Sequence, residues 1–142
     1  SDPELFGWVQ SDPRIRYLFP DYIDEDFRLW RETGIFTPVH MIVLSGKLDR
    51  EHPDLASRIY DGFERSKDAA YFDLLRDRAG FSVMYLREHV AAQFKKWGDP
   101  WVYGIKANRN MLDAYIDWSH QQGIMKDRFS LDQVFSQGVL DT

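Results

Sequence analysis

The chain has 142 residues, 44% of them hydrophobic and 15% aromatic, which is enough for one domain with its own core and excludes an intrinsically disordered chain. Its net charge is −5 and its 18 lysines and arginines are scattered, which argues against nucleic acid or an anionic membrane as a partner. The absence of cysteine excludes disulfides and thiolate metal sites, and no apolar run approaches the roughly 18 residues that span a bilayer.

The chain begins without an initiator Met or a signal-peptide pattern, so we interpret it as a mature chain or a piece of a longer one. We expect a cytoplasmic protein, with the periplasm as the alternative. Neither location is fixed by the lack of cysteine.

The first half of the chain is predicted to lead from an irregular segment into a buried strand. Three prolines make 1–23 irregular, a short helix follows over 24–33, and Gly34 ends it. The segment 37–45 is almost continuously apolar and rich in β-branched residues, and Gly46 ends it. Such a run is typical of a strand covered on both faces, as in the interior of an α/β sheet.

The second half of the chain is predicted to be helical. Apolar residues recur at helical spacing over 53–78, 82–97 and 108–123, and Ser130 begins a capping box that starts a short final helix. One strand cannot form a sheet. Its partners must come from residues 1–23, from another copy, or from a part of the protein that this chain lacks.

His40 lies within the predicted strand and has two interpretations. It is either a core histidine whose ring is satisfied by a neighbouring group, or a proton-handling group at a cleft. Burial lowers the pKa of an imidazole because it disfavours the charged form, and a carboxylate ligand raises that pKa again. In the second interpretation His40 is able to donate a proton near neutral pH.

The stretch WVYGIKANRN, residues 101–110, is the second informative segment. Asn108 is predicted to cap a helix, which places Arg109 in the first helical turn, where a cation opposes the macrodipole. Either Arg109 and free backbone N–H groups hold an anion, or Arg109 pairs with Asp113. The ring of Tyr103 is a candidate contact for an aromatic ligand, although aromatic residues more often fill a core.

The sequence points to no convincing metal site, and a role for a metal ion stays open. Asp117 and His120 lie three residues apart on one helix face, but two ligands are weak support for a metal ion. The acidic segment 21–32 lacks the glycine that a calcium loop requires at its sixth position.

Three segments carry short motifs in a fixed order: RIRYLFPDY (14–22), RETGIFTPVHMIVL (31–44) and YGIKANRNMLDAYIDWSHQQGI (103–124). Together they resemble the C-terminal part of the 4,5-dihydroxyphthalate decarboxylases, and the resemblance runs from about Asp12 onward. It implies the C-terminal portion of an α/β fold like that of the two-lobed type II periplasmic binding proteins, with this chain mostly helical around one central strand.

The resemblance also implies a division of the chain and a function. Residues 1–46 would hold the irregular segment, the short helix and the crossover strand of the α/β lobe, and 47–142 the C-terminal helical part of the same domain. The implied reaction converts 4,5-dihydroxyphthalate to 3,4-dihydroxybenzoate and CO2 without an organic cofactor.

We expect His40 to transfer the proton and Arg109, with Asn108 and Tyr103, to bind the substrate, a small aromatic carboxylate. A homo-oligomer is compatible with this interpretation. The alternatives are a solute-binding protein of a transporter, because one fold serves several functions, and a helical interaction module formed by the residues after Asn108.

Overall fold

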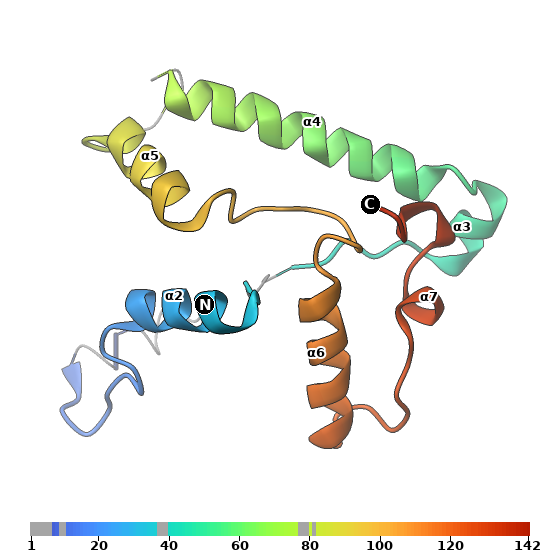
Figure 1. The fold of residues 1–142 in the computed structure, drawn as a ribbon, viewed down its shortest axis with the longest axis horizontal. Helices are drawn as coiled ribbons and strands as arrows, with labels where there is room; N and C mark the ends of the chain where they lie inside the picture. Colours follow the sequence, from blue (N-terminus) through green and yellow to red (C-terminus); the bar gives the residue numbers. More distant parts are fainter. Residues whose placement is uncertain (1–6, 9–10, 37–39, 77–79, 81) are drawn as a thin grey trace. The chain divides into compact units, whose positions relative to one another are not determined.

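The computed structural model describes residues 7–8, 11–36, 40–76, 80 and 82–142. These residues form helices and connecting segments (Figure 1). The elements are α2 (Tyr22–Thr33), α3 (Gly46–Glu51), α4 (Leu55–Leu75), α5 (Leu86–Trp97), α6 (Arg109–Gln121), α7 (Leu131–Val134) and a 3-10 helix, η1 (Gln137–Val139).

The predicted α/β fold is wrong, because the described residues contain no strand. Residues 40–45 of the expected central strand are irregular, and 37–39 lie outside the described residues. A strand needs a neighbouring strand to receive its backbone hydrogen bonds, and the described part of the chain provides none. The apolar run is therefore open to solvent, with Val43 89% exposed. The expected two-lobed binding-protein architecture requires that sheet and is therefore not supported either.

The chain forms two compact units, Ser1–Gly34 and Ile35–Thr142. In the first unit, α2 ends where Gly34 adopts a left-handed conformation (φ 70°) and donates its N–H to the Trp30 carbonyl oxygen at 2.8 Å. Arg28 bridges Glu25 and Glu32 along the exposed face of this helix. The expected segments 1–46 and 47–142 of one domain stay a prediction.

The long helix α4 organises the second unit. It contacts α3 and η1 near its N-terminal end and α5 near its C-terminal end (Figure 1). Ser45 caps α3 by accepting the N–H of Leu48 at 3.3 Å, and the Ser136 hydroxyl donates to Asp49 at 2.7 Å. The bond between Ser136 and Asp49 connects two segments that lie far apart in the sequence.

The buried core of the described residues also lies in the second unit. It consists of four side chains from the segment before α3, from α6 and from α7: Ile35, Met111, Leu112 and Leu131. Half-buried residues that include Ile105 and Phe135 pack against this core. The core therefore anchors α6 and the chain that leads into it.

Within the described residues, no helix combines the length and the apolar character needed to cross a bilayer.

Candidate functional site

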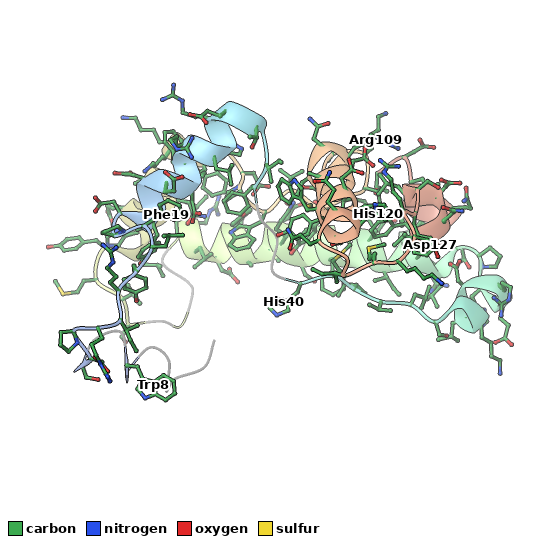
Figure 2. All side chains as sticks on the ribbon, turned by 90° about the horizontal axis from the view of Figure 1, so that it is seen from below. Trp8, Phe19, His40, Arg109, His120 and Asp127 are labelled. Carbon is green, nitrogen blue, oxygen red and sulfur yellow. The ribbon has the colours of Figure 1, made fainter. Side chains whose placement is uncertain are left out.

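The structure places His40 in solvent. The residue is exposed, and no hydrogen bond or ion pair joins its side chain to another described residue. In Figure 2, His40 lies apart from Arg109 on α6. The structure therefore does not bring these two predicted site residues together.

Asn108 holds the segment that leads into α6. Its side-chain amide donates to the carbonyl oxygen of Val102 at 2.9 Å and to that of Gly104 at 2.8 Å. Both hydrogens of the amide are used, and Asn108 does not cap the helix with its side chain. The two acceptors flank Tyr103, and Asn108 consequently fixes the backbone on either side of that residue.

Arg109 is the first residue of α6 and lies at the surface. It forms no ion pair with Asp113, although both residues are described, so one of the two interpretations of Arg109 is removed. A cation in the first turn is unfavourable with respect to the helix dipole unless an anion is near. No described residue occupies the Arg109 guanidinium, which leaves it available for an anionic ligand.

Three backbone N–H groups that precede α6 are used by the chain itself. The Thr142 carbonyl oxygen accepts from the N–H groups of Lys106 at 2.6 Å and Ala107 at 3.3 Å, and the Thr142 hydroxyl accepts from Ile105 at 3.2 Å. In this structure, an anion on Arg109 would not share these three donors.

Tyr103 lies against α4 and is 37% exposed. The Lys67 ammonium is 4.6 Å from the centre of the Tyr103 ring, within the range of a cation–π contact. The ring of Phe63 meets the Tyr103 ring edge to face, with centroids 6.4 Å apart. Two residues one helical turn apart on α4 therefore support this ring.

A cluster that we call the Lys67 clasp consists of the side chains of Lys67, Tyr71 and Asp99 with the backbone of Trp101. The Lys67 ammonium lies 3.4 Å from the Asp99 carboxylate and donates to the Trp101 carbonyl oxygen at 3.1 Å. The same carboxylate accepts from the Tyr71 hydroxyl at 2.7 Å and from the Trp101 N–H at 2.9 Å. The clasp thus ties the segment after α5 to the middle of α4.

The surroundings of the clasp stabilise its charged groups. Burial disfavours the Asp99 carboxylate, but hydrogen bonds from Tyr71 and Trp101 and the charge of Lys67 outweigh burial and lower the Asp99 pKa. Burial also disfavours the Lys67 ammonium, yet Glu64 and Asp99 outweigh it and raise the Lys67 pKa. Burial and the Asp99 carboxylate raise the pKa of the Tyr71 hydroxyl. The clasp is consequently a fixed ion pair near neutral pH.

The clasp was not predicted from the sequence, although one signal was present. Phe63, Lys67 and Tyr71 recur every four residues on α4, so Lys67 interrupts an apolar stripe. A charge in such a stripe requires a partner from another segment. Asp99, just after the predicted helix end, was the available carboxylate.

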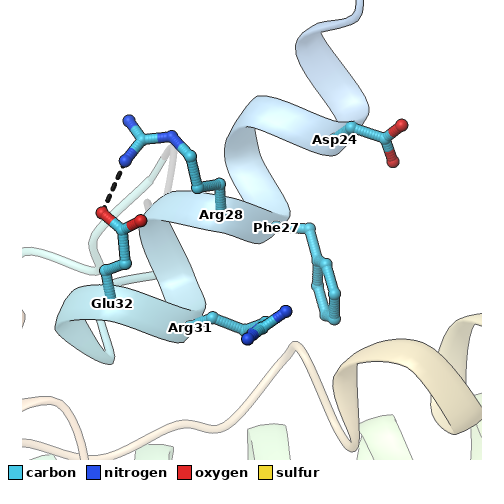
Figure 3. A pocket seen from close by; sticks show the side chains of 5 residues that line it. All are labelled: Asp24, Phe27, Arg28, Arg31 and Glu32. Atoms are coloured by element: carbon cyan, nitrogen blue, oxygen red, sulfur yellow. Dashed lines mark hydrogen bonds and ion pairs between the residues drawn. The ribbon is translucent and has the colours of Figure 1, made fainter.

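A hollow on α2 lies in the first unit. It is lined by residues of that single helix: Asp24, Phe27, Arg28, Arg31 and Glu32 (Figure 3). Arg28 and Glu32 pair with each other, and the Arg31 guanidinium lies 6.0 Å from the Phe27 ring centre. A hollow between side chains of one helix does not enclose a ligand.

The described residues contain no group of three or more His, Cys, Asp or Glu side chains that could hold a metal ion. Asp117, the carboxylate considered beside His120, accepts a hydrogen bond from Arg128.

Comparisons with known proteins give a distant relationship. A scan against models of protein families finds no match. The chain is 23% identical over 136 residues to a 4,5-dihydroxyphthalate decarboxylase of Comamonas testosteroni, and the match covers 94% of this chain and 41% of that protein. The chain thus spans about two fifths of the relative's length, and it is distantly similar to a decarboxylase.

Proposed function

We propose that the chain is part of a decarboxylase that acts on a hydroxylated aromatic dicarboxylate, with 4,5-dihydroxyphthalate as the substrate. The observation that carries this proposal is the similarity to the Comamonas enzyme, which extends over 94% of the chain. The products are 3,4-dihydroxybenzoate and CO2.

The proposed reaction replaces a carboxylate on the ring by a proton. The hydroxyl para to the departing carboxylate loses its proton and pushes electrons into the ring. A general acid then protonates the ring carbon that bears this carboxylate, the carbon–carbon bond breaks, and CO2 leaves as its electron pair returns to the ring. The protein must supply a cation for the retained carboxylate, a surface for the ring and a proton donor.

The described residues offer candidates for these roles. Arg109 is suited to the retained carboxylate because its guanidinium has no ion-pair partner among the described residues. Tyr103 is suited to the aromatic ring because it is supported by α4 and partly exposed. Asn108 acts on the ligand indirectly, by holding the backbone around Tyr103. His40 stays the proposed proton donor on the strength of the sequence; its imidazole is accessible, but this structure does not place it beside Arg109.

The test uses the complete protein that contains this chain. It is incubated with 4,5-dihydroxyphthalate while CO2 release and 3,4-dihydroxybenzoate are measured. Phthalate, which lacks the hydroxyl that drives the reaction, serves as the control and should release no CO2. Binding of 4,5-dihydroxyphthalate without turnover would overturn the decarboxylase and favour a solute-binding protein.

Arg109→Ala should raise KM for 4,5-dihydroxyphthalate about tenfold or more, because a charge-assisted hydrogen bond to the carboxylate is lost. Arg65→Ala, an exposed arginine on α4, is the matched control and should leave KM unchanged. Steady-state kinetics measure both variants. An unchanged KM in Arg109→Ala would remove this residue from substrate binding.

A further inference from the structure

The Lys67 ammonium is held by three oxygen atoms of the protein. The side chain is 11% exposed, and its ammonium donates to Glu64 at 3.2 Å and to the Trp101 carbonyl oxygen at 3.1 Å while lying 3.4 Å from Asp99. Two of the three ammonium hydrogens are thus bonded to Glu64 and Trp101, and Asp99 balances the charge. The Lys67 ammonium is therefore engaged by the protein itself, and its route to a ligand is through a neighbouring residue.

Tyr103 is the residue through which Lys67 can act. The Lys67 ammonium lies 4.6 Å from the centre of the Tyr103 ring. The backbone on either side of Tyr103 is held as well, because Lys67 binds the Trp101 carbonyl oxygen and Asn108 binds those of Val102 and Gly104. Both the ring and its backbone are thus preorganised, which reduces the entropy lost when a ligand binds.

The cation also changes the electronic character of the ring. An aromatic face carries negative charge, and an ammonium on one face draws that charge toward itself. The remaining exposed surface of the ring, 37% of the residue, is then better suited to an electron-rich ring. A ring with two hydroxyl groups is electron-rich.

We propose that Lys67 is a positioning residue, which orients and polarises the Tyr103 ring for contact with the ring of a dihydroxylated aromatic acid. This inference rests on the proposed function. In this inference Tyr103 contacts the substrate ring and determines which rings bind, and Lys67 holds and polarises the Tyr103 ring.

The test is a double-mutant cycle in the complete protein, with 3,4-dihydroxybenzoate as the probe and the dissociation constant measured by titration calorimetry. Lys67→Met should weaken binding about tenfold, as expected for a desolvated cation–π contact. Lys67→Arg should restore most of the affinity. In a Tyr103→Leu background, Lys67→Met should have no further effect, because the ring through which it acts is absent.

Lys47→Met is the matched control, because this lysine is 78% exposed and pairs with Glu51 at 3.9 Å, and its affinity should equal that of the wild type. If Lys67→Met fails to fold, Lys67→Gln is carried through the same cycle, because it keeps a donor for the Trp101 carbonyl oxygen.

The outcomes separate this inference from the proposed function. If the Lys67 substitution weakens binding equally in both backgrounds, Lys67 supports the fold alone; the positioning role is overturned and the proposed function stands. If the wild-type protein neither binds 3,4-dihydroxybenzoate nor turns over 4,5-dihydroxyphthalate, the proposed function fails and the inference fails with it.

Discussion

Asn108 and Arg109 are neighbours whose side chains have opposite roles. The Asn108 amide is fully used by two backbone carbonyl groups, and the Arg109 guanidinium has no ion-pair partner in the described part of the chain. The sequence predicted that both would bind substrate, because a helix start with an adjacent arginine favours an anion. It did not predict the acceptors of Asn108, since those depend on how 102–104 folds back.

Gly104 lies where the backbone has a positive φ and passes close to Thr142. Its φ is +104°, and a Cβ atom there would lie 2.6 Å from the carbonyl carbon of Thr142. Gly104→Ala should therefore lower the free energy of unfolding by about 1–3 kcal/mol. Gly62→Ala, inside α4 with no atom within 4 Å of the new Cβ, should instead raise it by about 0.5–1 kcal/mol. Urea denaturation compares the two, and a Gly104→Ala variant as stable as the wild type would contradict the observed close approach.

His40→Gln tests the proposed proton donor. If the imidazole protonates the ring, kcat of the complete protein for 4,5-dihydroxyphthalate should fall about a hundredfold or more. The melting temperature should not change, because the exposed side chain has no partner among the described residues. Kinetics and thermal unfolding are measured on the same preparation. Unchanged turnover would exclude His40 from the mechanism.

At the scale of elements, the helices were predictable and the strand was not. Gly34 and Gly98 end α2 and α5 as predicted, and the capping box at Ser130 starts α7. These signals are local, because a helix satisfies its own backbone within four residues. The backbone N–H and C=O groups of a strand bond to another strand, which can lie far away in the sequence. The apolar run ending at Ser45 therefore favoured β structure but did not guarantee it.

Some helix boundaries also differ for local reasons. The helix predicted from Ser82 begins at Leu86, because Tyr85 adopts a left-handed conformation with φ 59°. The short elements α3 and η1 were not predicted, since neither has enough residues to show a helical period.

The Lys67 clasp links α4 to the segment after α5 and should make stability depend on acid pH. The Asp99 pKa lies below its ordinary value of 3.8, so its ionised form adds stability at higher pH. That contribution is present above the ordinary pKa and is lost as the pH falls through the lower pKa of the folded state. Asp99→Asn removes it.

The difference in unfolding free energy between wild type and Asp99→Asn should therefore be largest near neutrality and shrink as the pH falls below about 4. Urea denaturation over a series of pH values measures this difference. Tyr71→Phe keeps the Asp99 carboxylate and removes one of its hydrogen-bond donors. The unfolding free energy of Tyr71→Phe should therefore depend on pH less than that of the wild type and more than that of Asp99→Asn. A difference that stays constant with pH would mean that the carboxylate charge adds nothing to the clasp.

At the scale of the whole molecule, burial is concentrated in one place. Four side chains of the second unit form the buried core of the described residues, and the apolar run after 39 lies outside it. The sequence predicted instead that the apolar run would be the buried centre of the fold. Hydrophobic composition does not reveal which apolar segment packs against other parts of the chain.

Leu112→Ala and Val43→Ala compare these two environments directly. Leu112 is 7% exposed and its truncation should cost about 2–5 kcal/mol of unfolding free energy through lost burial and a cavity. Val43 is 89% exposed, so its truncation should change stability by less than about 0.5 kcal/mol. Chemical denaturation measures both. A large loss in Val43→Ala would indicate that this segment is covered in solution.

The burial of Lys67 has a consequence for covalent chemistry at its nitrogen. An acylating reagent attacks the neutral amine, and the raised pKa, three acceptors and the Tyr103 ring keep this amine protonated and shielded. Lys67 should therefore be acylated far more slowly than Lys47. The rate of Lys67 acylation, followed by mass spectrometry, would then measure how often the clasp opens.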